Sequence, residues 1–218
     1  RQFPKHPFGW KVLGVVLGVE DRKLEAEKAN QRAVKLAPQD SEALCNLGVT
    51  LQALGRFDES EVRLRQAIGL KTDYAAAHFN LGIVLKALGR INEAEASYSK
   101  CLIFKPDYAE AHNNLGNILK ELGRLKEAEA SLSQAIFFKP DYAEAYNNLG
   151  ITYNELGRLK EAEASLRQVI AMKPDYAAAH NNMGVLLKEL GRSDEAEASY
   201  RRAIALKFDY AEAHSNLG

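Results

Sequence analysis

The sequence predicts an all-α solenoid built from antiparallel helix pairs that stack side by side. Two observations support this prediction. A 34-residue pattern recurs six times without an insertion, and a further copy begins at Ala211. Most copies hold two helix-forming stretches separated by Leu-Gly-Arg. A fixed period of this size is typical of repeat arrays, in which each unit packs against its neighbours instead of around one central core.

Each copy is numbered here from position 1 to position 34. The full repeats are 7–40, 41–74, 75–108, 109–142, 143–176 and 177–210. Residues 1–6 are interpreted as the tail of a preceding repeat, because Pro4 falls at position 32, and 211–218 as the truncated start of another. Solenoids need polar capping repeats at their ends. We therefore expect the natural array to continue past both ends, and the uncapped C-terminal face to favour end-to-end self-association.

The first helix of each repeat has predicted start and stop signals. The Asp-Tyr-Ala-Glu runs at 107–110, 141–144 and 209–212 predict a capping box with Asp as the N-cap. A glycine at position 15 is expected to end this helix in the left-handed conformation. These glycines are Gly55, Gly89, Gly123, Gly157 and Gly191. The second helix is expected to end before the Lys-Pro pair, because proline cannot continue a helix.

Small residues recur where the helices are expected to cross. Position 8 is glycine in every copy, and position 20 is alanine or serine. A glycine inside a helix costs about 1 kcal/mol relative to alanine. Such a cost, repeated in register, indicates a close approach of two backbones. Position 4 holds four histidines, which we interpret as packing residues and not as metal ligands: His78, His112, His180 and His214.

The composition excludes several classes of function. Positive and negative side chains balance at 29 each, which gives no electrostatic drive toward nucleic acid or an anionic membrane. No apolar run approaches the roughly 20 residues that span a bilayer. The two cysteines, Cys45 and Cys101, form no CxxC pair, so we expect a reducing compartment, the cytoplasm. No catalytic motif is present, and neither enzyme activity nor a cofactor or metal is predicted.

The pattern resembles the tetratricopeptide repeat family over residues 7–218. Its signature residues in the fourth copy are His112, Leu115, Gly116, Leu119, Ala128, Leu132, Ala135 and Pro140. The resemblance implies a right-handed superhelix, in which the first helices line a concave groove and the second helices lie on the convex side. It also implies that the partner is a protein or peptide.

The groove positions that the core does not use carry a column of asparagines, with lysines at position 12. An asparagine side chain offers both donors and an acceptor, which matches a peptide backbone. We therefore predict that an extended peptide binds in the groove. The predicted contacts are Asn46, Asn80, Asn113, Asn114, Asn117, Asn147, Asn148, Asn154, Asn181, Asn182, Lys86, Lys120 and Lys188. The alternative reading is that these asparagines bond only neighbouring backbone.

The segment 113–124 is similar in sequence to the repeat region of O-linked N-acetylglucosamine transferases. It reads Asn-Asn-Leu-Gly-Asn-Ile-Leu-Lys-Glu-Leu-Gly-Arg. That similarity implies a second possible role, the recruitment of protein substrate to a catalytic domain that is not in this chain. A third possibility is a self-assembly module. The residues after Gly218 would separate the second role from the first, and a concentration-dependent mass would reveal the third.

Overall fold

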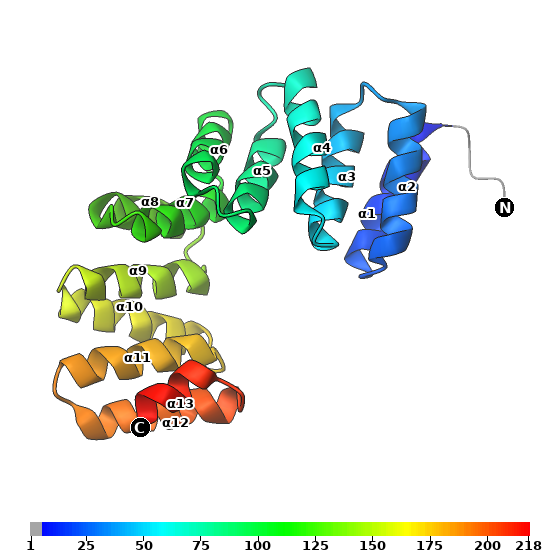
Figure 1. Ribbon diagram of the computed structural model, residues 1–218. Coiled ribbons are helices and arrows are strands. Elements are labelled where there is room, and N and C mark those ends of the chain that lie inside the picture. The colour runs from blue at the N-terminus through cyan, green and yellow to red at the C-terminus, as the bar shows by residue number, and fades with distance from the viewer. Residues whose placement is uncertain (1–5) are drawn as a thin grey trace. The chain divides into compact units, whose positions relative to one another are not determined.

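The computed structural model describes residues 6–218, and within that range it contains helices and no strand (Figure 1). The helices are α1 Pro7–Val19, α2 Lys23–Leu36, α3 Ser41–Ala53, α4 Phe57–Leu70, α5 Ala75–Ala87, α6 Ile91–Phe104, α7 Ala109–Glu121, α8 Leu125–Phe138, α9 Ala143–Glu155, α10 Leu159–Met172, α11 Ala177–Glu189, α12 Ser193–Leu206 and α13 Ala211–Leu217. This confirms the predicted all-α solenoid of helix pairs. The residues before His6, which include Pro4 of the expected repeat tail, lie outside the described range.

The chain forms two compact units, one ending at Pro106 and the other running from Asp107 to Gly218. The first unit holds α1 to α6 and the second holds α7 to α13. In each unit every odd-numbered helix that has a partner packs against the helix that follows it. Isolated helices of 13 or 14 residues are marginal in water, so this packing stabilises them.

The predicted glycine stop of the first helix is confirmed. Gly55 and Gly123 have φ of 75° and 73°, in the left-handed region that glycine adopts without steric cost. The first repeat has Asp21 in this turn instead, with φ of 58°. A non-glycine residue in this region is uncommon, although aspartate is among the residues that tolerate it best.

The predicted aspartate N-caps are wrong at Asp107, Asp141 and Asp209. The N-cap residues are Tyr108, Tyr142 and Tyr210, and none makes a side-chain capping bond. The tyrosine at position 34 moves the aspartate one residue too far from the helix. At the junction between the first two full repeats, where this tyrosine is absent, Asp40 directly precedes α3 and its Oδ1 accepts from the amides of Glu42 and Ala43 at 3.0 and 3.1 Å.

The position-8 glycines do have a packing reason, but the main neighbour is a side chain and not a second backbone. A Cβ placed on Gly116 would lie 2.6 Å from Leu132 Cγ, and one on Gly82 would lie 2.6 Å from Tyr98 Cε1. Leu132 and Tyr98 occupy position 24 of the same repeat and are almost fully buried. The glycine therefore makes room for a large side chain from the second helix.

Consecutive first helices contact one another within each unit. In the second unit α7 contacts α9, α9 contacts α11, and α11 contacts α13, and in the first unit α1, α3 and α5 do the same. Among the described residues no comparable contact joins α2 to α4 or α8 to α10. Since the first helices are closer together than the second helices, they form the inner face of each unit.

Ion pairs join neighbouring repeats on the side of the second helices. Arg158 Nη1 lies 2.7 Å from Glu129 Oε1 of the preceding repeat, and its Nε lies 3.0 Å from Glu161 Oε1 of its own. Arg192 repeats the pattern with Glu163 and Glu195, at 2.9 and 2.6 Å. Such surface pairs contribute roughly 0–1 kcal/mol each, so they fix the arrangement of repeats more than they stabilise it.

Candidate functional site

The inner face of the second unit carries a chain of asparagine side chains that links its repeats. Asn148 Nδ2 donates to Asn113 Oδ1 at 2.9 Å, and Asn182 Nδ2 donates to Asn147 Oδ1 at 2.9 Å. Asn216 Nδ2 donates to Asn181 Oδ1 at 3.1 Å in the same way. In each pair, position 6 of one repeat bonds position 5 of the repeat before it. The asparagines therefore form contacts between repeats, which the sequence pattern alone did not predict.

A carboxylate fixes the direction of the first of these bonds. Asn113 Nδ2 donates to Glu144 Oε1 at 3.2 Å, and an ionised carboxylate only accepts. The amide nitrogen of Asn113 must therefore point toward Glu144, which leaves its oxygen to accept from Asn148. Asn148 in turn must present its nitrogen to Asn113. No partner is seen among the described residues for Asn148 Oδ1, so this oxygen is left as an acceptor.

Burial separates the predicted asparagines into two groups. Asn113 and Asn181 have no exposed surface and Asn147 has 5%. These three cannot contact a ligand directly, which corrects the expectation that they line the groove. Asn148 and Asn182 are half-buried on the same face. The position-5 residues thus hold the position-6 residues, and only the position-6 residues have surface to offer.

The first unit has no equivalent chain of amides among its described residues. Asn80 Nδ2 bonds the carbonyl of Ala76 in its own helix at 2.8 Å, as the alternative reading of the asparagine column expected. The residue that would pair with it is Cys45, a buried free thiol. Burial raises the pKa of Cys45 to about 11, although hydrogen bonds with Tyr74 and Asn80 oppose this shift. Asn46 is half-buried and its backbone carbonyl accepts from Thr50 Oγ1 at 2.9 Å.

The remaining predicted contacts lie on the first helices with mixed charge around them. Asn114, Asn117 and Lys120 are half-buried on α7, and Lys86 is half-buried on α5. Lys188 is exposed on α11. Asn154 Nδ2 donates to Glu189 Oε1 at 3.1 Å. Position 13 of the second unit places one exposed carboxylate in each full repeat, at Glu121, Glu155 and Glu189.

The position-4 histidines are packing residues, though only one of them is buried. His78 is 8% exposed and stacks on Phe104 with ring centroids 5.7 Å apart, while His214 is exposed. The Nε2 atoms of His78, His180 and His214 lie 2.8–2.9 Å from a backbone carbonyl in the preceding loop. The described residues contain no group of three or more His, Cys, Asp or Glu side chains placed to hold a metal ion.

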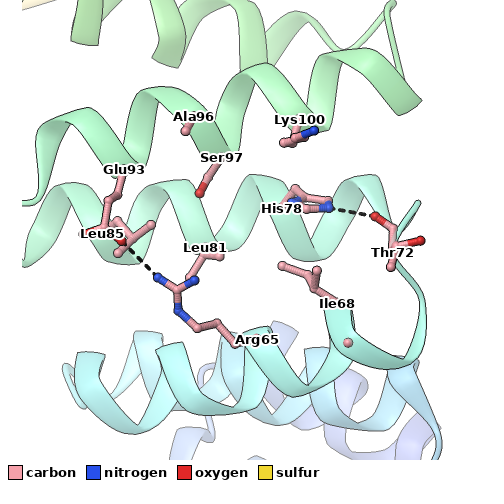
Figure 2. A pocket seen from close by; sticks show the side chains of 11 residues that line it. Arg65, Ile68, Thr72, His78, Leu81, Leu85, Glu93, Ala96, Ser97 and Lys100 are labelled. Atoms are coloured by element: carbon pink, nitrogen blue, oxygen red, sulfur yellow. Dashed lines mark hydrogen bonds and ion pairs between the residues drawn. The ribbon is translucent and has the colours of Figure 1, made fainter.

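Two pockets, each between a first helix and the second helices on either side of it, were not predicted from the sequence. The first has a volume of about 410 Å³ and lies where α4, α5 and α6 meet (Figure 2). Its floor is apolar, with Ile68 and Leu81, and the ion pair between Arg65 and Glu93, 3.1 Å apart, lies across it. A pocket of about 480 Å³ between α10, α11 and α12 uses the same repeat positions. This recurrence was visible in the sequence as an apolar residue at positions 7, 11 and 28.

Comparisons with known proteins support the fold. A family model described as TPR repeat matches residues 84–123 and 116–157. Models described as tetratricopeptide repeat match residues 147–211 and 29–62. No curated protein matches the chain, so the expected likeness to the transferase arrays stays a prediction. None of the described helices has the length and apolar character that crossing a membrane requires. The cytoplasmic location also stays a prediction.

Three solved structures share the architecture. PilW, described as a type IV pilus biogenesis factor, is 23% identical with a TM-score of 0.87, and the match covers 97% of this chain and 98% of that chain. YrrB, described as a TPR protein with an unusual peptide-binding site, is 22% identical with a TM-score of 0.71, covering 87% and 97%. TTC0263, a thermophilic TPR protein from Thermus thermophilus, is 26% identical with a TM-score of 0.65, covering 81% and 96%.

Proposed function

Because the chain belongs to the tetratricopeptide repeat family, we propose that it is a protein-interaction scaffold whose second unit binds an extended peptide along α7, α9 and α11. The observation that carries this proposal is the fixed direction of the amide chain. Glu144 orients Asn113, Asn113 orients Asn148, and the oxygen of Asn148 is left as an acceptor. Asn182 Nδ2 makes the same bond to Asn147 Oδ1, although no carboxylate orients Asn147, because Ala178 stands at the position equivalent to Glu144.

The two half-buried asparagines, Asn148 and Asn182, would then bind one feature of a peptide, its backbone N–H groups. Asn148 and Asn182 each supply one carbonyl acceptor, at equivalent positions of consecutive repeats. Each such bond contributes about 0.5–1.5 kcal/mol net. Micromolar binding needs about 8 kcal/mol. Two bonds therefore give weak capture that tolerates many sequences, and tighter binding requires side-chain contacts as well.

The charged residues beside Asn148 and Asn182 would make binding selective for particular peptide side chains. Lys120 and Lys188 at position 12 favour acidic side chains, and Glu155 and Glu189 at position 13 favour basic ones. A peptide of mixed charge fits this surface better than a uniformly acidic one. In the first unit, Asn46, Asn80 and Lys86 would contribute less, because Asn80 bonds only Ala76 of its own helix and no asparagine of the preceding repeat holds it in place.

The test is a screen of immobilised ten-residue peptides of varied sequence, followed by affinity measurements on the hits. The double variant Asn148→Ala and Asn182→Ala should weaken binding of the hits about fivefold or more, since two net hydrogen bonds are lost. A matched control is Gln134→Ala, an exposed residue on α8. Circular dichroism must show that each variant is folded at the assay temperature. Unchanged affinity in the folded double variant would rule out Asn148 and Asn182 as the binding residues.

A further inference from the structure

The first repeat contains a pocket that the other repeats lack the residues to form. It has a volume of about 310 Å³ and opens on the inner face of the first unit, between α1 and α3. Its wall is mainly apolar. The residues that shape it are Gly14 and Gly18 of α1, Asn30 of α2, and Asn46, Thr50 and Ala53 of α3.

Two departures from the repeat pattern create this space. Position 24 is a buried leucine or tyrosine in the other five repeats, namely Leu64, Tyr98, Leu132, Leu166 and Tyr200, but it is the smaller Asn30 here. Position 12 is a long or polar side chain in the others, namely Gln52, Lys86, Lys120, Asn154 and Lys188, but it is Gly18 here. A Cβ on Gly18 would meet no atom within 4 Å.

Asn30 brings an unpartnered acceptor to this pocket. The side chain is 1% exposed, and its Nδ2 donates to Thr50 Oγ1 at 2.9 Å and to the carbonyl of Asn46 at 3.4 Å. Thr50 Oγ1 gives its own proton to that carbonyl at 2.9 Å, so it must accept from Asn30. This fixes the amide direction. Asn30 Oδ1 then has no partner in the described structure and lies against Gly14.

The chemistry of the pocket selects one kind of occupant. The ligand group must be apolar, because the only charged lining residue is Lys23, which pairs with Asp21 at 3.1 Å. It must donate a hydrogen bond, to satisfy Asn30 Oδ1. It finds no further donor on Asn30, because both hydrogens of Asn30 Nδ2 are already used. Among side chains only the tryptophan indole is apolar, donates and does not accept.

We propose that this pocket binds the indole side chain of a tryptophan in a partner peptide. The volume lies at the lower end of the roughly 300–1,000 Å³ of ligand pockets, which suits one aromatic side chain. Gly14 and Gly18 offer the ring a flat helix surface, and Asn30 Oδ1, which lies against Gly14, is the acceptor proposed for the indole N–H. Only the idea that the indole belongs to an extended peptide rests on the function proposed above.

The test uses N-acetyl-tryptophanamide as the probe, with the full chain, followed by nuclear magnetic resonance or calorimetry. Wild type should bind it, with shifts at the amides of Gly14, Gly18 and Ala53. The 1-methylindole analogue, which lacks the donor, should bind about two- to tenfold more weakly, the range that one net hydrogen bond gives. Absence of binding to wild type, or equal binding of the methylated probe, would overturn the proposal.

Two variants close the pocket without disrupting the fold. Asn30→Leu restores the residue of the second, fourth and fifth repeats, and Gly18→Lys restores that of the third, fourth and sixth. Both should abolish probe binding, with a melting temperature equal to or above that of wild type. Retained affinity in either variant would contradict the assignment. Neither variant alters Asn148 or Asn182, so this result is independent of the peptide-groove test.

Discussion

Asn148 Nδ2 donates a 2.9 Å hydrogen bond to Asn113 Oδ1, across 35 positions of the chain. The bond joins two repeats and also sets which end of the Asn148 amide remains available. A buried asparagine that has no contact with a ligand can therefore control what its neighbour offers to one.

Asn113→Asp should destabilise the second unit by at least about 1 kcal/mol more than Asn147→Asp. Both changes bury a carboxylate, but only Asn113 faces a second carboxylate, Glu144, and the residue equivalent to Glu144 beside Asn147 is Ala178. Urea unfolding at pH 7 measures the difference. It should shrink at pH 4, where the introduced carboxyl is protonated and can donate to Glu144. Equal losses for the two variants at pH 7 would mean that the amide direction is not set by Glu144.

Asp40→Ala should cost about 0.5–2 kcal/mol of stability, because Asp40 caps α3 and lies 2.9 Å from Lys11 Nζ. Asp141→Ala is the matched control and should cost little, since Asp141 is not an N-cap. Thermal and urea unfolding of the two variants would show the contrast. A loss as large for Asp141 would restore the capping box that the sequence predicted.

The effect of Asp40 should also depend on pH. Burial tends to raise the pKa of its carboxyl, but the bonds from Lys11 and from the amides of Ala43 and Glu42 outweigh burial and lower it. A carboxyl whose folded pKa is depressed stabilises the fold above its unfolded pKa of about 3.9, and loses this contribution as the pH falls. The stability gap between wild type and Asp40→Ala should therefore be full at pH 6 and shrink below about pH 4. A gap that persists at pH 2 would argue against an ionised cap.

Gly82→Ala should destabilise the first unit by about 1–3 kcal/mol, because the new Cβ would lie 2.6 Å from the ring of buried Tyr98. Gly69→Ala in α4 meets no atom within 4 Å and should stabilise the same unit by about 0.5–1 kcal/mol. The two variants have the same chemistry and opposite expected signs. Differential scanning calorimetry measures both. A stabilising Gly82→Ala would show that the glycine is not there to accommodate Tyr98.

Cys45 and Cys101 should resist alkylation in the folded protein. Both thiols are buried, and burial raises the pKa of each to about 11, so the reactive thiolate is scarce at pH 8. Labelling by iodoacetamide should be slow in buffer and fast in 6 M guanidinium, and mass spectrometry would follow each site. Rapid labelling of either cysteine under native conditions would contradict its burial.

The helices and their stops could be predicted from the sequence because those signals are local. Gly55 and Gly123 end the first helices, as a glycine after an amphipathic run indicates. The N-caps were mispredicted because Tyr108 and Tyr142 lie between the aspartate and the helix. The predicted N-cap is wrong by one residue, and a capping-box sequence pattern does not locate the start of a helix to that accuracy.

The asparagine column was visible in the sequence, but the sequence did not indicate that position 5 is buried and position 6 is partly exposed. Whether position 5 or position 6 reaches the surface depends on contacts with the next repeat, such as that of Asn113 with Glu144. The pocket lined by Gly18 and Asn30 has a signal in the sequence. Asn30 and Gly18 depart from the pattern together, and in a repeat array two coupled departures on one face indicate a local change of packing.

The most direct test of the central claim is a double-mutant cycle between the protein and a peptide backbone. One arm is Asn148→Ala, and the other replaces one amide of a bound peptide by an ester, which removes a single N–H. We expect a coupling energy of about 0.5–1.5 kcal/mol at one ester position, the value of one net hydrogen bond. Additive losses at every ester position along the peptide would show that Asn148 does not accept from the ligand backbone.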